Sequence, residues 1–275
     1  MRIAVCFKTI PEFRMLTEQD WRVGDGYSVD VRFAKQGFNC FDESALELAL
    51  KLAEQTKSME EPVELTALTI DDEQSDRFLK HLFAVQYDKT VRIYCDRQLD
   101  LRFNPLAIAD LISAYVRQIG RQQLLFLGRQ GAEGDNGQTG FLVAERLGWP
   151  CIREVIDVAV ANAAGRLKIT SRLEGATLVQ TVTPPVVLVI GNTPHSPYLR
   201  VPTLKQKLGA AQKQIAVIPC RDLGFESDRL IGLDKVLVNL ERRRQGRSCT
   251  WLEGGDGREK ARRLFDLYLR ERLRP

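Results

Sequence analysis

The sequence predicts a doubly wound α/β fold with a mostly parallel sheet. Short, near-continuous apolar runs alternate with amphipathic helical patterns through the first half of the chain. A glycine-rich loop leaves one of those runs and opens a helix. Strands that lack polar alternation are buried on both faces, and helices on both sides of a parallel sheet produce that burial.

The first half supplies four predicted strands and four predicted helices. The helix at 42–52 places Ala45, Leu48 and Leu52 on one face, and Pro105 sits just inside the start of another helix. The predicted strands are 3–7, 63–70, 90–94 and 124–127, and the predicted helices are 42–52, 76–85, 105–119 and 139–147. Such sheets bind ligands at the carboxyl ends of their strands, so the loops after Phe7, Ile70 and Leu127 are candidate sites.

The second half adds an antiparallel hairpin to this sheet. Residues 155–182 alternate Val, Ala and Thr around Gly165, which is typical of two paired strands. We then expect a core strand at 185–190, a proline-rich loop at 192–202, a helix at 203–213 and a short strand at 215–218. The α/β domain is therefore predicted to span residues 1–225.

Residues 226–275 are predicted to form a C-terminal arm. A helix capped by Asp256 carries one apolar stripe, which packs either on its own domain or, as we favour, on a partner subunit. The basic residues of the arm are read as a solvated tail or as a docking site for an acidic partner. They are Arg242, Arg243, Arg244, Arg247, Arg258, Lys260, Arg262 and Arg263.

Composition places the chain among ordinary folded proteins. It has 275 residues, a net charge of +4 and 44% hydrophobic residues, so whole-chain charge does not point to nucleic acid. The six cysteines lack metal-ligand spacing. The longest apolar run, 186–190, is too short for a membrane span, and no secretory signal is visible. A cytoplasmic location is expected.

The loop from Gly128 to Gly140 is the leading candidate site. It holds five glycines in thirteen residues and opens a helix, so its main-chain N–H groups can approach a phosphate. The loop is neither a Walker A sequence nor a dinucleotide fingerprint after the first strand. Its candidate contacts are Gly128, Gln130, Gly131, Gly134, Asp135, Asn136, Gly137, Gln138 and Thr139.

The stretch Asn39, Cys40, Phe41 and Asp42 is the second candidate. Either Asp42 or Ser44 can cap the following helix, and this reading accounts for much of the pattern. The Asn39 amide remains, and it can both donate to and accept from an adenine edge.

These motifs together resemble the beta subunits of electron transfer flavoproteins. The likeness extends over roughly residues 1–225, in matching order and spacing. It rests on Arg2-Ile-Ala-Val-Cys-Phe-Lys8, Asn39-x-Phe-Asp42, the Gly128 to Gly140 loop, and Arg200-Val-Pro-Thr-Leu-Lys205 followed by Ala210-Ala-Gln-Lys-Gln-Ile215.

The resemblance implies an adenine-nucleotide-binding, Rossmann-like subunit of a heterodimer. FAD would lie mainly in the alpha subunit, and this chain would hold AMP or a second FAD against Cys6, residues 39–42, Ile70 and the 128–139 loop. Electrons would enter from a dehydrogenase or a ferredoxin-type donor, with Leu204 as the exposed anchor for that partner. Gly137 stands where AMP-type members tend to have asparagine, which leaves the choice between AMP and FAD open.

A carrier of this kind is not an enzyme in its own right. Neither His81 nor His195 lies near a plausible nucleophile with an orienting group. The alternative function is a stand-alone adenine-nucleotide-binding regulatory protein of the same fold. An ATP-pyrophosphatase ligase is disfavoured because residues 8–12 lack its Ser-Gly-Gly loop.

Overall fold

The computed structural model describes most of the chain. The described residues are 1–17, 19–24, 29–31, 33–57, 62–95, 101, 103–132, 134, 136–161, 165–226, 239 and 248–273. They fall into two compact units, Met1–Val238 and Asn239–Pro275. The division lies among residues outside the described set, so the predicted boundary after residue 225 stays a prediction.

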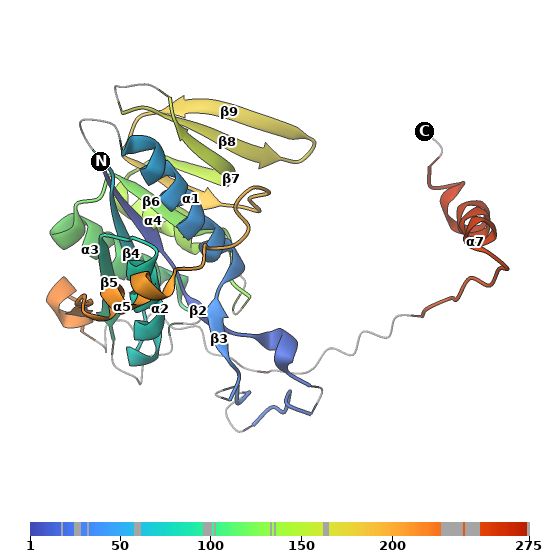
Figure 1. The fold of residues 1–275 in the computed structure, drawn as a ribbon, viewed down its shortest axis with the longest axis horizontal. Coiled ribbons are helices and arrows are strands. Elements are labelled where there is room, and N and C mark those ends of the chain that lie inside the picture. Colours follow the sequence, from blue (N-terminus) through green and yellow to red (C-terminus); the bar gives the residue numbers. More distant parts are fainter. Residues whose placement is uncertain are drawn as a thin grey trace. The chain divides into compact units, whose positions relative to one another are not determined.

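The described part of the first unit is organised around one nine-stranded sheet (Figure 1), in the order β11-β5-β4-β1-β6-β10-β7-β8-β9. The strands are β1 (Arg2–Cys6), β4 (Glu64–Ile70), β5 (Lys89–Tyr94), β6 (Leu124–Gly128), β7 (Cys151–Val160), β8 (Leu167–Leu173), β9 (Ala176–Val182), β10 (Val186–Ile190) and β11 (Ala216–Pro219). Each pairing from β11 to β7 is parallel, and those of β8 with β7 and β9 are antiparallel. The mostly parallel sheet is therefore confirmed.

Helices cover both faces of this sheet, which confirms the doubly wound fold. The helices are α1 (Cys40–Thr56), α2 (Asp76–Ala84), α3 (Pro105–Tyr115), α4 (Thr139–Leu147) and α5 (Leu204–Ala211). Strand β1 separates two cores, because Ile3 and Val5 pack with residues of α1 and α2 while Ala4 packs with residues of α3 and α4. Successive side chains of a strand point to opposite faces, as this division requires.

The antiparallel addition is larger than one hairpin. Strands β7, β8 and β9 form a meander, whose second turn at Glu174 and Gly175 was not predicted. Gly175 has φ +72°, a conformation that glycine adopts without strain. A separate two-stranded sheet joins β2 (Thr9–Pro11) to β3 (Gln36–Phe38), and strands this short leave no periodic pattern in the sequence.

The second unit contains α7 (Gly257–Leu264), continued by a π-helical turn at Phe265–Leu269. Asp256 caps α7 as expected, its carboxylate accepting from the Glu259 N–H at 2.7 Å. Glu259 reaches back to Gly255 N rather than to Asp256. The apolar stripe of Leu264, Phe265 and Tyr268 is exposed. The predicted basic residues 242–244 and 247 lie outside the described residues.

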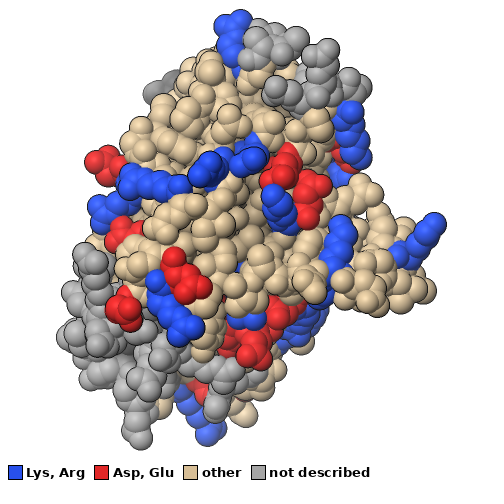
Figure 2. All heavy atoms as spheres, turned by 90° about the vertical axis from the view of Figure 1, so that its left-hand side faces the viewer, with Lys and Arg blue, Asp and Glu red and all other residues tan. Residues whose placement is uncertain are grey.

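Surface charge agrees with the mixed composition. Acidic and basic side chains lie next to one another over the face of the molecule drawn in Figure 2. Among the described helices, none is long and apolar enough to cross a membrane.

Candidate functional site

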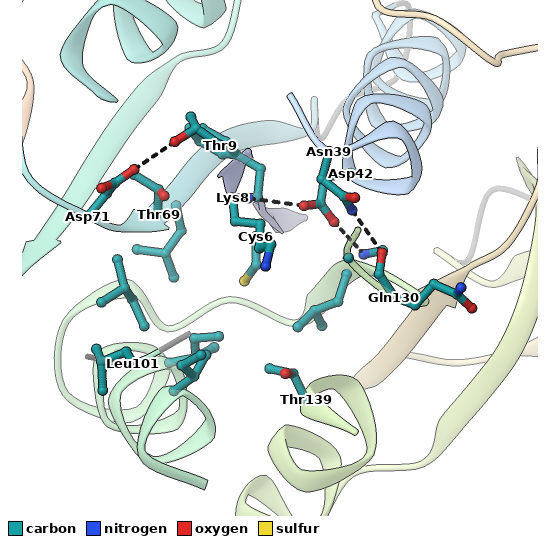
Figure 3. Close-up of a pocket in the computed structure, with 18 of the residues that line it drawn as sticks. Cys6, Lys8, Thr9, Asn39, Asp42, Thr69, Asp71, Leu101, Gln130 and Thr139 are labelled. Carbon is teal, nitrogen blue, oxygen red and sulfur yellow. Dashed lines mark hydrogen bonds between the residues drawn. The ribbon is translucent and has the colours of Figure 1, made fainter. Parts of the chain in front are cut away.

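A cavity of about 820 Å³ opens at the carboxyl ends of β1, β4 and β6 (Figure 3). Strand β1 has β4 on one side and β6 on the other, so the chain leaves the sheet in opposite directions here, and ligands of open α/β sheets bind at such a point. The predicted residues that line the cavity are Cys6, Asn39, Asp42, Ile70, Gly128, Gln130, Gly131, Asn136, Gly137, Gln138 and Thr139.

Three predicted contacts lie away from the cavity wall, and a fourth lies outside the described residues. Cys40, Phe41 and Gly134 are not among its lining residues, and Asp135 lies outside the described residues. The Phe41 ring instead lies under the Arg129 guanidinium, at 5.1 Å from the ring centre. The Arg129 side chain also pairs with Glu154 at 3.0 Å. Phe41 therefore supports a lining residue rather than the cavity itself.

Asp42 holds the ends of β1 and β6 together. Its carboxylate accepts from the Lys8 N–H at 3.0 Å and from the Gly128 N–H at 3.1 Å. Burial raises the pKa of Asp42 to about 6, although its hydrogen bonds lower it. Helix α1 begins at Cys40 with Asn39 at the N-cap position. Neither Asp42 nor Ser44 is therefore the cap, and the cap interpretation of these residues was wrong.

Gly128 is required by this close approach. A Cβ built on it would lie 2.1 Å from Asp42 Oδ1 and 2.9 Å from the Asp42 backbone nitrogen. Any side chain at this position would push helix α1 away from strand β6.

Asn39 is almost fully buried beside the cavity, and one of its two polar atoms is unsatisfied. Its Nδ2 donates to the Gln130 carbonyl at 2.9 Å, while no described residue offers a hydrogen bond to its Oδ1. Buried polar atoms are nearly always paired. This acceptor has almost no exposed surface, so a ligand with an N–H donor can pair with it only after a small movement of the Asn39 side chain.

The glycine-rich loop ends at the amino terminus of α4. Gly137 has φ +61°, and the Gln138 N–H donates to Asn136 Oδ1 at 3.0 Å. No side chain caps the start of α4. The first-turn N–H groups of a helix are unsatisfied within the helix and carry its positive dipole end, so this position suits an anion.

The opposite wall of the cavity was missed by sequence reasoning. Thr9 donates to one Asp71 oxygen at 3.0 Å, and the Asp72 N–H donates to the other at 2.8 Å. Burial raises the pKa of the Asp71 carboxyl. Thr9 lies two residues beyond Phe7 and begins β2, and Asp71 and Asp72 directly follow β4, so extending each predicted strand-end loop by two residues would have included them. Leu101, Ile108 and Ile112 add an apolar surface.

Leu204 lies outside the cavity and is exposed. It opens α5 with 73% of its surface accessible, so it does not pack under its own helix. Thr203 and Gln206 form a reciprocal cap at this helix start. The apolar side chains Tyr198, Val201 and Leu208 are exposed nearby in sequence. We call the four residues Tyr198, Val201, Leu204 and Leu208 the apolar ridge.

The polar face of α1 binds residues 195–200, the segment that leads to the apolar ridge. Glu47 accepts from the Arg200 N–H at 3.0 Å and pairs with its guanidinium at 2.7 Å, and Glu54 pairs with the same guanidinium. Glu43 accepts from the Leu199 N–H at 3.2 Å. Lys51 donates to the His195 carbonyl at 2.6 Å. We call these contacts the α1 clamp.

The fold and the position of the cavity define a doubly wound α/β protein with a ligand crevice at its sheet edge. The sequence model described as the electron transfer flavoprotein domain matches residues 30–223. The chain is also 30% identical over 277 aligned positions, covering all of both proteins, to Escherichia coli (strain K12) YgcR, which is named as an electron transfer flavoprotein subunit. The chain therefore belongs to the electron transfer flavoprotein family, whose members carry electrons rather than act as conventional enzymes.

Proposed function

We propose that this chain is the beta subunit of a heterodimeric electron transfer flavoprotein. It binds an adenine nucleotide, AMP or a second FAD, in the 820 Å³ crevice, while an alpha subunit holds most of the redox FAD. The isoalloxazine supplies the redox chemistry, and the protein sets its position and surroundings. The unsatisfied Asn39 Oδ1 in the crevice wall is the observation that best supports this proposal.

The crevice residues suit the three parts of an adenine nucleotide. The buried, unpaired Asn39 acceptor suits the exocyclic amino group of adenine once the side chain shifts toward the crevice. The Asp71 carboxylate, fixed by Thr9, suits ribose hydroxyl donors. The main chain of residues 128–139 and the uncapped start of α4 suit the phosphate. Each group of the ligand thus meets a protein group of complementary chemistry.

The apolar ridge is proposed as the contact for the redox partner, a dehydrogenase or a ferredoxin-type donor. Leu204 would be its anchor, because one exposed apolar side chain in a small interface allows rapid dissociation after each transfer. The amphipathic stripe of the C-terminal arm is proposed to pack on the alpha subunit. The cytoplasmic location remains a prediction.

The decisive experiment is to produce the chain together with a candidate alpha subunit and to identify everything that copurifies. We expect a one-to-one heterodimer with a yellow flavin spectrum, and AMP or FAD in the nucleotide fraction released by heat and identified by mass. A colourless homodimer that releases an adenine nucleotide would instead support the stand-alone regulator. A heterodimer without bound nucleotide in this chain would remove the crevice from the proposal.

A further inference from the structure

Two cysteines lie side by side at the edge of the crevice. Strands β11 and β5 pair in parallel, with Ile218 opposite Ile93 and Pro219 opposite Tyr94. The residue that follows each strand is a cysteine: Cys220 follows β11, and Cys95 follows β5. Cys220 is also the first residue of a 3-10 turn, Cys220–Leu223, so the two cysteines immediately follow the last paired residues of neighbouring strands.

The side chains of these cysteines also share one face of the sheet. Ile93 and Ile218 pack into the core beneath α3 and α4, and the two cysteines lie two residues further along the chain from them. Cys220 belongs to that core and Cys95 packs against it, and the Cys220 sulfur is close enough to help raise the pKa of Cys95. Neighbouring strands run about 4.8 Å apart, which lies within the Cα separation of about 4.4–6.8 Å that a disulfide spans.

We propose that Cys95 and Cys220 are a reversible dithiol–disulfide pair. The bond would join the end of β5 to β11, which lies at the edge of the sheet. Cys95 lines the crevice and is half-buried, so a small oxidant can reach it, while Cys220 is buried behind it. Intracellular disulfides are usually transient and redox-sensing rather than structural, which fits a pair that is reduced at rest.

The oxidant that we propose is a peroxide. The Cys95 thiolate attacks the O–O bond, giving a sulfenic acid and hydroxide, and the proton released by the Cys95 thiol converts that hydroxide to water. The Cys220 sulfur then attacks Cys95 Sγ, the S–S bond forms, and a second water leaves with the Cys220 proton. Two thiols and one peroxide thus give one disulfide and two waters. A thiol reductant reverses the step by exchange.

The pair reacts slowly by this route. Burial, together with the neighbouring Cys220 sulfur, raises the pKa of the Cys95 thiol, so little thiolate is present near neutral pH. The proposal concerns this chain alone and does not depend on nucleotide binding or on an alpha subunit.

The test is peptide mapping of the full, reduced chain after treatment with hydrogen peroxide. We expect a peptide pair cross-linked through Cys95 and Cys220, with the loss of two hydrogen atoms in mass. Both cysteines should become resistant to alkylation in denaturant to the same extent, and dithiothreitol should restore both. The proposal is overturned if Cys95 pairs with another cysteine, stops at a sulfinic acid, or stays fully alkylatable while exposed Cys40 and Cys249 oxidise.

Two variants sharpen this test. Cys220→Ala should abolish the cross-link and leave Cys95 as a sulfenic or sulfinic acid. Cys151→Ala removes another half-buried thiol from β7 and should leave the Cys95–Cys220 cross-link at its original yield. Loss of the cross-link in both variants would contradict the proposal. If Cys220→Ala fails to fold, the peptide map of the peroxide-treated wild-type chain still decides whether Cys95 and Cys220 pair.

Discussion

The two ends of helix α1 serve different parts of the molecule by different kinds of contact. At its amino end, Asn39 and Asp42 bind main-chain groups of the crevice loops. Further along, Glu47 and Glu54 bind the side chain of Arg200 in the α1 clamp. The crevice contacts are fixed by sheet topology and are buried, whereas the clamp becomes progressively more exposed toward Glu54.

This difference predicts that the free-energy cost of a substitution decreases along α1, from the crevice to Glu54. A buried N–H that loses its acceptor costs about 1–3 kcal/mol, whereas an exposed ion pair contributes about 0–1 kcal/mol. The crevice contacts of α1 should therefore be sensitive to single substitutions, and the exposed end of the α1 clamp at Glu54 should tolerate them.

The largest effect is expected for Asp42→Ala. The change leaves the Lys8 and Gly128 N–H groups without their acceptor in a buried place. We expect the free energy of unfolding to fall by about 4 kcal/mol, as the sum of two such losses, and this can be measured by urea denaturation.

The control for this variant is Asp222→Ala, which removes an exposed carboxylate with one loose ion pair to Arg221 at 3.7 Å. Its effect should stay within about 0.5 kcal/mol. Equal effects of the two substitutions would show that Asp42 does not hold the crevice loops together.

A second test uses the pH dependence of stability. The folded-state pKa of Asp42 is raised to about 6 from an ordinary value of 3.8, so between these values the folded state holds a proton that the unfolded state has lost. This contribution is fully present below pH 3.8 and is lost as the pH rises through about 6. The unfolding free energy of the wild type minus that of Asp42→Asn should therefore fall by about 2 kcal/mol from pH 4 to pH 7. A constant difference across this range would mean that Asp42 titrates normally.

The contrast between the crevice contacts and the α1 clamp also explains which features the sequence could predict and which it could not. Apolar runs such as 124–127 and glycine spacing are local signals, so the sheet and the crevice loops were predictable, whereas residues of the opposite wall such as Thr9 and Asp71 were missed. The α1 clamp joins Glu47 to Arg200 across more than a hundred residues, and nothing in a single sequence pairs two such charges. Asp42 was predicted as a contact and lines the cavity, but its role depends on the Gly128 N–H, which only the folded chain brings near.

A third, smaller effect separates the two acids of the clamp. Glu47→Ala removes a nearly buried carboxylate that accepts from both the main chain and the guanidinium of Arg200, so we expect a loss of about 2 kcal/mol. Glu54→Ala removes the more exposed partner of the same guanidinium and should cost less than about 1 kcal/mol. Urea denaturation of both variants tests this order, and a larger loss for Glu54→Ala would contradict the gradient.

The smallest effect on stability is expected at the apolar ridge, where the effect on function should be largest. Leu204→Ala should change the free energy of unfolding by less than about 0.5 kcal/mol, since most of the side chain is already exposed. In the proposed heterodimer, assayed with a dehydrogenase that reduces its flavin, the variant should raise KM at least about tenfold, because an interface anchor contributes about 2 kcal/mol or more. Leu208→Ala, one turn further along α5 and similarly exposed, is the matched control and should raise KM less. Equal increases in KM for the two variants would mean that the apolar ridge binds the partner without a single anchor. An unchanged KM for Leu204→Ala would mean that other residues recognise the partner.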